Sequence, residues 1–386
     1  MKLVLDAEQE ELRATVRKVL TDRSPTAKVR EVMDSELGYD PDLWRTLGDL
    51  GVLGLVVPED LGGSGAGHTE RAVVMEELGR ALAPSPFLAS AVLATDVLLA
   101  LDADEPARAA LLPRLAAGEL AGTVAAAEGG GSWDRAGGTT TATVHDGTWW
   151  LDGVKTPVLA GDSADLVLVH ARTPGGPGWF AVEGNAVGLT RTALTGLDPT
   201  RRFAALAFDG TPARPLSVPD AAAALETVAD LAAVALAAEQ VGGMGRALEL
   251  TVEYAKARMQ FGRAIGSYQA VKHGCADMYS AWEQAVSVLR FASWTADHDR
   301  PGLPAAASLA QTYIGPAFFE TAAAMVHYHG GIGYTWEHDA HLYYKRAKSS
   351  ELLLGPPSDH RARLAALVIT DHIPTDHIPT DDPKDL

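Results

Sequence analysis

The sequence has little of several features that define other classes of protein. It contains one cysteine, Cys275, in 386 residues, so no disulfide framework can form within the chain. Its 32 basic residues are outnumbered by 50 acidic ones, which gives a formal net charge of −18. A chain this acidic lacks the basic face that phosphate backbones require, so we do not expect nucleic acid as a partner.

The sequence also lacks a long apolar run. A membrane-spanning helix needs about 18 or more apolar residues, and the best candidate, residues 86–101, is interrupted by Asp96. The first residues lead directly into a charged helical pattern from Asp6 to Leu20, and they show no signal peptide. We therefore expect a soluble, cytoplasmic protein that does not enter a membrane.

What is present is an alternation of helical and β patterns over a length that suits two or three domains. Apolar residues recur every three or four positions up to about residue 120, which predicts an N-terminal helical domain over 1–120. The period then changes to two, which predicts a middle β domain over 121–218. Helical periodicity returns over 219–366, and this segment is predicted to be a C-terminal four-helix domain.

Two details support these boundaries. In the β region, two strand-like runs, 139–144 and 149–153, flank His145-Asp146-Gly147, which is a strong hairpin pattern. After residue 366 the motif Asp-His-Ile-Pro-Thr occurs twice, and its prolines and missing apolar face predict a disordered tail over 367–386. A metal site at the paired histidines of this tail is the less favoured interpretation.

The first chemically informative segment is Arg258-Met259-Gln260-Phe261-Gly262, with Gln269 behind it. Arg258 closes a long predicted helix, and an arginine there suits a bidentate phosphate contact. The simpler interpretation is an arginine that favours the helix C-terminus, with Phe261 in the core.

The second segment is His329-Gly330-Gly331-Ile332-Gly333, which interrupts two predicted helices. Its glycines would allow the backbone to approach a ligand closely. A plain glycine-rich linker is the alternative. Both segments in this order, after a β domain, are much more specific than either alone.

With these residues the chain resembles the acyl-CoA dehydrogenase family, flavoproteins that oxidise acyl-CoA thioesters, over residues 1 to about 366. The resemblance implies a mainly α fold with a central β domain. It implies that Arg258 and Gln269 contact the pyrophosphate of FAD, that Phe261 packs near it, and that the turn of Gly330, Gly331 and Gly333 lies against the adenosine end. In such enzymes these contacts serve an FAD held mainly by a neighbouring subunit.

The β domain departs from the family pattern. The family has a T-E-x-x-x-G-S-D loop, and this chain has Ala127-Glu128-Gly129-Gly130-Gly131-Ser132-Trp133-Asp134. Where the family has K-x-[FW]-I-T-N-[AG], this chain reads Lys155-Thr156-Pro157-Val158-Leu159-Ala160-Gly161, and Pro157 has no backbone donor. We therefore expect that no second flavin sits in this chain's own cleft.

The catalytic base is also missing from its expected positions. The reaction needs a carboxylate to remove the α-proton of the thioester. The family places this glutamate at one of two positions, which correspond here to Gly355 and Ala232. Nearby acids (Asp230, Glu239, Glu351 and Asp359) are poorly placed substitutes, so no catalytic residue is assigned.

The resemblance therefore implies the subunit that lacks the catalytic glutamate in a heterotetrameric acyl-CoA dehydrogenase. Certain actinobacterial enzymes that oxidise the CoA thioesters of steroid side chains are built in this way. The expected partners are a homologous catalytic subunit and an acyl-CoA substrate, and the expected cofactor is FAD. Two alternatives remain: a self-sufficient homotetrameric dehydrogenase with an unrecognised base, and a CoA-binding or scaffold relative without a redox role.

Overall fold

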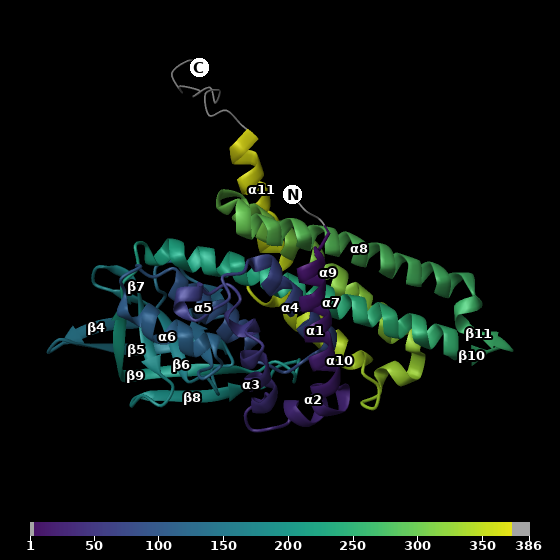
Figure 1. Ribbon diagram of the computed structural model, residues 1–386, viewed down its shortest axis with the longest axis horizontal. Coiled ribbons are helices and arrows are strands. Elements are labelled where there is room, and N and C mark those ends of the chain that lie inside the picture. Colours follow the sequence, from purple (N-terminus) through teal and green to yellow (C-terminus); the bar gives the residue numbers. More distant parts are fainter. Residues whose placement is uncertain (1–3, 373–386) are drawn as a thin grey trace, which may run out of the picture.

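A computed structural model describes residues 4–372, and it has the predicted order of helical, β and helical parts (Figure 1). The N-terminal part contains α1 (Ala7–Arg23), α2 (Thr26–Met33), α3 (Pro41–Asp49), η1 (Val52–Gly54), η2 (Glu59–Leu61), α4 (His68–Ala81), the π-helical η3 (Leu88–Ala94), α5 (Thr95–Leu99) and α6 (Pro106–Ala116). Helix α1 begins where the sequence predicts because the Asp6 side chain accepts a hydrogen bond from the Gln9 backbone N–H.

The middle part is a β domain over Gly122–Leu216. Its strands are β1 (Gly122–Ala125), β2 (Ala127–Glu128), β3 (Ser132–Trp133), β4 (Thr141–His145), β5 (Thr148–Leu159), β6 (Leu166–Thr173), β7 (Gly176–Glu183), β8 (Leu189–Leu194) and β9 (Phe203–Leu216). The large sheet has the order β1-β6-β4-β5-β9-β7, with β8 on β9 and a further β6–β7 pairing. The predicted hairpin is confirmed as β4 and β5, in which His145 pairs with Thr148.

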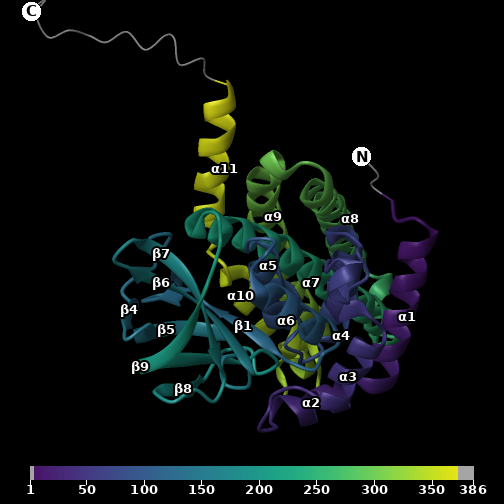
Figure 2. The ribbon, with the colours of Figure 1, turned by 60° about the vertical axis from the view of Figure 1, so that its left-hand side comes forward.

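The C-terminal part contains α7 (Ala221–Ala257), α8 (Gln269–His298), α9 (Leu303–His329), α10 (Ala340–Leu352) and α11 (Pro357–His372), with short elements β10 (Met259–Gln260), β11 (Arg263–Ala264), η4 (Ile265–Ser267), η5 (Arg300–Gly302) and η6 (Gly330–Tyr334). Two predictions about this part were wrong. The helical pattern of residues 336–353 predicts a last helix that starts at Trp336, but a turn follows η6 and α10 begins at Ala340. The helical part also extends beyond residue 366, since α11 continues to His372 and points away from the body (Figure 2). Residues 373–386 of the predicted tail lie outside the described residues.

Helix α7 is the centre of the C-terminal part. It is long and apolar enough to cross a membrane by length and composition alone, but 72% of its most apolar window is buried inside the protein. It packs against α4, α8 and α9. The apolar composition of α7 is therefore that of a core helix.

Helices α4 and α7 cross at a contact made by two glycines. A Cβ added at Gly79 would lie 1.9 Å from the Glu239 carbonyl oxygen, and one added at Gly242 would lie 1.8 Å from the Glu76 carbonyl oxygen. Each glycine thus faces the backbone of the opposite helix. This approach fixes the N-terminal helices directly on α7.

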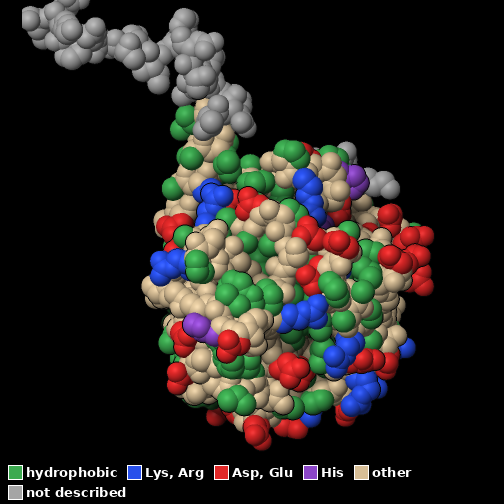
Figure 3. Space-filling model, turned by 90° about the vertical axis from the view of Figure 1, so that its left-hand side faces the viewer, with side chains coloured by type: hydrophobic (Ala, Val, Ile, Leu, Met, Phe, Trp, Pro, Cys, Tyr) green, Lys and Arg blue, Asp and Glu red, His purple; other side chains and the backbone are tan. Residues whose placement is uncertain are grey.

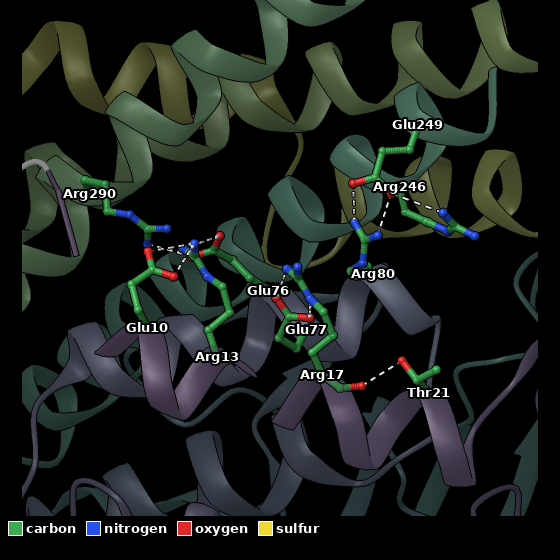
Figure 4. Close-up of polar contacts among 10 residues, drawn as sticks. All are labelled: Glu10, Arg13, Arg17, Thr21, Glu76, Glu77, Arg80, Arg246, Glu249 and Arg290. Carbon is green, nitrogen blue, oxygen red and sulfur yellow. Dashed lines mark hydrogen bonds and ion pairs between the residues drawn. The ribbon is translucent and has the colours of Figure 1, made fainter. Parts of the chain in front are cut away.

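Charged side chains add a second set of contacts among α1, α4, α7 and α8 (Figure 4). Arg17 on α1 makes two hydrogen bonds to Glu77 on α4, at 2.7 and 2.8 Å. Arg80 on α4 pairs with Glu249 on α7, and Arg290 on α8 lies 2.6 Å from Glu76. These pairs tie α1, α4, α7 and α8 together at the rim of their apolar contact.

The apolar core has two parts. One buried cluster runs continuously through the N-terminal helices and the C-terminal helices, and it includes Leu20, Leu47, Val92, Leu236 and Phe318. A second, smaller cluster lies between the strands of the β domain. The N-terminal and C-terminal helical parts of the chain, its first and third segments, therefore share one core.

On the face shown in Figure 3, basic side chains of the described residues lie scattered among acidic and apolar ones. No broad basic surface gathers there within residues 4–372.

Candidate functional site

A cleft of about 490 Å³ lies where the β domain meets α10 and α11. The residues that line it are Leu88, Leu93, Val124, Ala127, Gly130, Gly131, Trp133, Pro157, Leu159, Leu194, Thr195, Gly196, Phe203, Ser349, Leu352, Leu353, Leu354, Gly355, Pro356 and Asp359. A largely apolar cleft with a few polar groups is typical of a small-molecule site.

Of the two positions predicted for a base, the structure places only one in this cleft. Gly355 lines it, with a φ of +109°, and a Cβ at this residue would lie 3.3 Å from Nε2 of His360. Such a φ disfavours any side chain, so this glycine is required by the local backbone. Ala232 is 0% exposed in the apolar core, where an ionised side chain would have no solvent.

The acids near these positions are mostly occupied by cations. Glu239 is buried and pairs with both Arg201, at 2.6 Å, and Arg346. Asp230 accepts two hydrogen bonds from Arg363.

Two further acids lie on and after α10. Glu351 pairs with Lys348 at 2.7 Å. Asp359 is the acidic side chain that lines the cleft among the described residues. A proton acceptor inside the cleft would therefore have to be Asp359.

Glu239 belongs to a four-charge cluster formed by Asp198, Arg201, Glu239 and Arg346, all buried. The Arg346 Nε donates to Asp198 Oδ2 at 2.5 Å, and Arg201 Nη1 donates to the Ser350 hydroxyl at 2.9 Å. Burial opposes the charge of Arg346, but Asp198 and Glu239 more than compensate and raise the pKa of its guanidinium above its usual value. The cluster joins the segment between β8 and β9 to α7 and α10.

The β-domain wall of the cleft is held by an ion pair between a buried lysine and a partly buried glutamate. Lys155 is 0% exposed, and its Nζ lies 2.7 Å from Glu128 Oε1. Glu128 also accepts hydrogen bonds from the backbone N–H and the hydroxyl of Thr139, both at 2.6 Å. Partial burial acts against ionisation, but Lys155 and Thr139 hold the pKa of Glu128 well below its ordinary value.

The wall of the cleft offers few polar side chains to the edge of a flavin ring. Ala127 and Leu159 carry apolar side chains, and Pro157 has no N–H to donate to a ring carbonyl. Trp133 also fills part of the space, packed against the apolar core. Donors for a flavin at these residues would have to be backbone N–H groups, and the absence of a second flavin from this cleft stays a prediction.

Next to Lys155, the ring of His170 is completely buried, and neither of its nitrogens has a hydrogen-bond partner. Burial and the charge of Lys155 lower the pKa of His170 to about 4, from 6.5. In the unfolded chain the ring would bind a proton already near pH 6.5, so the stability contributed by the neutral ring is complete above pH 6.5 and is lost between pH 6.5 and 4.

We expect the free energy of unfolding to fall by up to about 3 kcal/mol across this window through His170 alone, at about 1.36 kcal/mol per unit of pKa shift. Urea titrations at several pH values give the free energy of unfolding as a function of pH. Between pH 4 and 6.5 this free energy should change less steeply with pH for His170→Leu than for the natural protein. The exposed His145 serves as the control, because His145→Asn should leave the slope unchanged. Equal slopes for all three proteins would contradict the assignment.

The predicted FAD contacts lie elsewhere, at the end of the helices opposite the β domain (Figure 1). Strands β10 and β11 form a short arm after α7, on which Phe261 is 92% exposed with a φ of +52°. Arg258 and Gln269 at the two ends of the arm are also exposed. Their exposure leaves the guanidinium and the amide available to a group outside this chain.

The predicted glycine turn lies beside the arm, because the ring of Tyr254 on α7 stacks on His329, directly before the turn. Gly330 and Gly331 are exposed, and a Cβ at either would meet nothing within 4 Å. The exposed backbone here, with Arg258, suits a pyrophosphate or ribose from a neighbouring molecule. Gly333 differs: it is buried, and a Cβ there would lie 2.7 Å from the Val326 carbonyl oxygen, so its role is close packing.

Sequence reasoning missed the residues that support this region. Arg30, from α2, donates to the Trp336 carbonyl at 2.7 Å and to Asp339 Oδ1 at 3.0 Å. His338 lies 4.3 Å from His329, between ring centroids. Arg30 is 306 residues from Trp336 along the chain, so periodicity and motifs give no signal for this contact.

The chain belongs to the acyl-CoA dehydrogenase family. Residues 6–119 match the acyl-CoA dehydrogenase N-terminal domain, and residues 222–368 match the C-terminal domain. Members of this family depend on FAD. The order of helical domain, β domain and helical domain is that of the family, which confirms the predicted fold.

Three relatives are informative. The acyl-CoA dehydrogenase IpdE2 of Mycobacterium tuberculosis is 38% identical over 94% of this chain and 97% of its own length. The solved structure of a Tcur3481-Tcur3483 steroid ACAD (acyl-CoA dehydrogenase) variant is 34% identical, with a TM-score of 0.85, over 94% of this chain and 98% of that one. The ChsE4-ChsE5 complex from Mycobacterium tuberculosis is 29% identical, with a TM-score of 0.87, over 97% of this chain and 100% of that one. Two of these relatives are thus assemblies of two different named chains.

Proposed function

We propose that this chain is the subunit without a catalytic base in a heteromeric acyl-CoA dehydrogenase. In this proposal a homologous catalytic subunit carries the glutamate, and this chain lends its arm and glycine turn to the ADP half of that subunit's FAD. The reaction is the α,β-desaturation of an acyl-CoA thioester. Because one similar structure is described as a steroid ACAD, we propose a CoA ester of a steroid side chain as the substrate.

The observation that carries the proposal is the state of the cleft at Gly355. The family's usual base position holds a glycine with a φ of +109°, and a side chain there would press on His360. The nearby acids Glu239 and Asp230 are bound to arginines. A bound carboxylate that is needed to hold two guanidinium groups cannot also accept a substrate proton without breaking the cluster.

The position of the predicted FAD contacts supports the same division of roles. Arg258, Gln269 and Gly330 are exposed at the end of the helices opposite the β domain, whereas the cleft lies against the β domain. When bound, FAD accepts the hydride that leaves the substrate β-carbon. This chain's residues would bind and orient the nucleotide end of the cofactor, and the proton would be removed by a carboxylate of the other subunit.

The test is the visible flavin absorption of the chain purified alone and co-purified with a homologous subunit that carries the glutamate. We expect no flavin band from the lone chain and a stoichiometric band, with dehydrogenase turnover, from the pair. A saturated flavin band and turnover from the lone chain would overturn the proposal.

Asp359 gives the self-sufficient alternative a specific candidate. If the lone chain turns over and Asp359→Asn abolishes the turnover without loss of flavin, Asp359 is the base of a homomeric enzyme. Glu351→Gln is the matched control, because Glu351 is an acid of the same region that pairs with Lys348 at 2.7 Å. A colourless protein both with and without the partner would instead indicate a CoA-binding or scaffold relative.

A further inference from the structure

The arm and the glycine turn are connected by a column of three rings, in which the first pair is stacked and the second is tilted. Tyr254, one helical turn before Arg258, lies 4.4 Å from His329 with an angle of 28° between the rings. His329, directly before Gly330, lies 4.3 Å from His338 with an angle of 47°. The column therefore runs from the root of the arm, past the root of the turn, into the loop that follows it.

Backbone hydrogen bonds orient both histidine rings. His329 Nδ1 lies 2.7 Å from the Met325 carbonyl oxygen, so this nitrogen carries a proton and donates. His338 Nδ1 lies 3.1 Å from the Ala340 backbone N–H and accepts from it, which places the proton of His338 on Nε2. Neither ring can rotate without losing a hydrogen bond.

Arg30 closes the column from the N-terminal domain. Its Nη1 donates to the Trp336 carbonyl oxygen at 2.7 Å, and its Nη2 donates to the His338 carbonyl oxygen at 3.2 Å and to Asp339 Oδ1 at 3.0 Å. A planar guanidinium fixes several acceptors at once, which a lysine ammonium does less well. One side chain of α2 thus determines where the loop after the glycine turn lies.

We propose that Arg30 and the column of Tyr254, His329 and His338 are positioning residues: they set the distance between the arm and the glycine turn, and with it the affinity of the assembled enzyme for the ADP half of FAD. This inference rests on the proposed function, in which both segments contact that half. The column touches neither substrate nor the reacting atoms. It acts by holding two surfaces in register before the cofactor arrives, which reduces the ordering cost of binding.

The test is the dissociation constant of FAD for the complex of this chain with its glutamate-bearing homologue, measured by flavin fluorescence after removal of the cofactor. We expect Tyr254→Ala and Arg30→Gln to weaken FAD binding roughly tenfold, comparable to other losses of a supporting interaction. Tyr254→Phe keeps the ring and should bind FAD as the natural complex does. Arg30→Lys keeps the charge but loses the planar guanidinium with its several donors. The FAD affinity of this variant should therefore lie between that of the natural complex and that of Arg30→Gln.

Stability is measured in parallel on the same complexes without FAD. Arg45→Gln is the matched control, because Arg45 is an exposed arginine of α3 that pairs with Asp42 within its own helix. If Arg30→Gln lowers the melting temperature, its effect on FAD affinity cannot be separated from a loss of stability. The comparison of Tyr254→Phe with Tyr254→Ala then tests the positioning role, because both change the same half-buried side chain and only Tyr254→Ala removes the ring. Equal FAD affinity for Tyr254→Ala, Tyr254→Phe and the natural complex would overturn the inference.

Arg258→Ala separates this inference from the proposed function. If Arg258→Ala does not weaken FAD binding, the proposed nucleotide contact is wrong and the positioning role falls with it. If Arg258→Ala weakens binding and Tyr254→Ala does not, the proposed function stands and only the positioning role is overturned.

Discussion

Replacing Arg346 with methionine is expected to lower the free energy of unfolding by about 3–5 kcal/mol, because the substitution leaves the buried Asp198 carboxylate without its arginine and Glu239 with one arginine in place of two. Asp198 is 2% exposed and Glu239 is 6% exposed, and Arg346 is a partner of both. Arg201 would still pair with Glu239, but no arginine would remain on Asp198 at hydrogen-bond distance among the described contacts.

Urea unfolding followed by circular dichroism measures this effect. Arg45→Met is the control: Arg45 is exposed and pairs with Asp42 within one helix, so its loss should cost less than about 1 kcal/mol. A loss below about 1 kcal/mol for Arg346→Met as well would show that the four-charge cluster is solvated and does not join the domains.

Replacing Gly242 with alanine is expected to destabilise the protein by about 2–4 kcal/mol, although alanine is normally the better residue within a helix. The reason is the crossing of α4 and α7, where the new Cβ would lie 1.8 Å from the Glu76 carbonyl oxygen. The obstacle is backbone and cannot rotate away, so the two helices must separate. That separation would also disturb Gly79, which faces Glu239 from the other side.

Thermal unfolding of the lone chain tests this prediction, with Gly331→Ala as the control. A Cβ at Gly331 would meet nothing within 4 Å, so this variant should melt close to the natural protein. An unchanged or raised melting temperature for Gly242→Ala would mean that the helices do not approach as closely as described.

The features that could be predicted from the sequence are those that depend on residues close together along the chain. The hairpin of β4 and β5 follows from alternation around His145-Asp146-Gly147, and the start of α1 follows from Asp6 and Gln9. Local rules suffice where the partners lie within about one or two turns of each other.

The features that could not be predicted depend on distant residues. Arg346 meets Asp198 across 148 positions of sequence, and nothing in either segment shows that the other is its partner. For the same reason the sequence could not show that Glu239 is bound by two arginines. It could show only that Glu239 lies about two turns from Ala232 on the same face of the helix.

The error at Trp336 has a related cause. Residues 336–339 carry a helix-compatible sequence, but Arg30 binds the carbonyls of Trp336 and His338 from outside. These contacts with α2 accompany a turn over residues 336–339, and α10 begins only at Ala340.

The single apolar core shared by the first and third segments has a consequence for how the chain is made. Apolar residues of α4 such as Val74 and Leu78 belong to the same buried cluster as α7, which packs against α4 and begins only at residue 221. A chain synthesised from its N-terminus at roughly 5–20 residues per second produces these side chains many seconds before the helix that covers them. During that interval the N-terminal helices carry an uncovered apolar surface, while the β domain, with its own small core, can already close. A fragment that ends near residue 120 would remain in that uncovered state permanently, and we expect it to aggregate in place of folding.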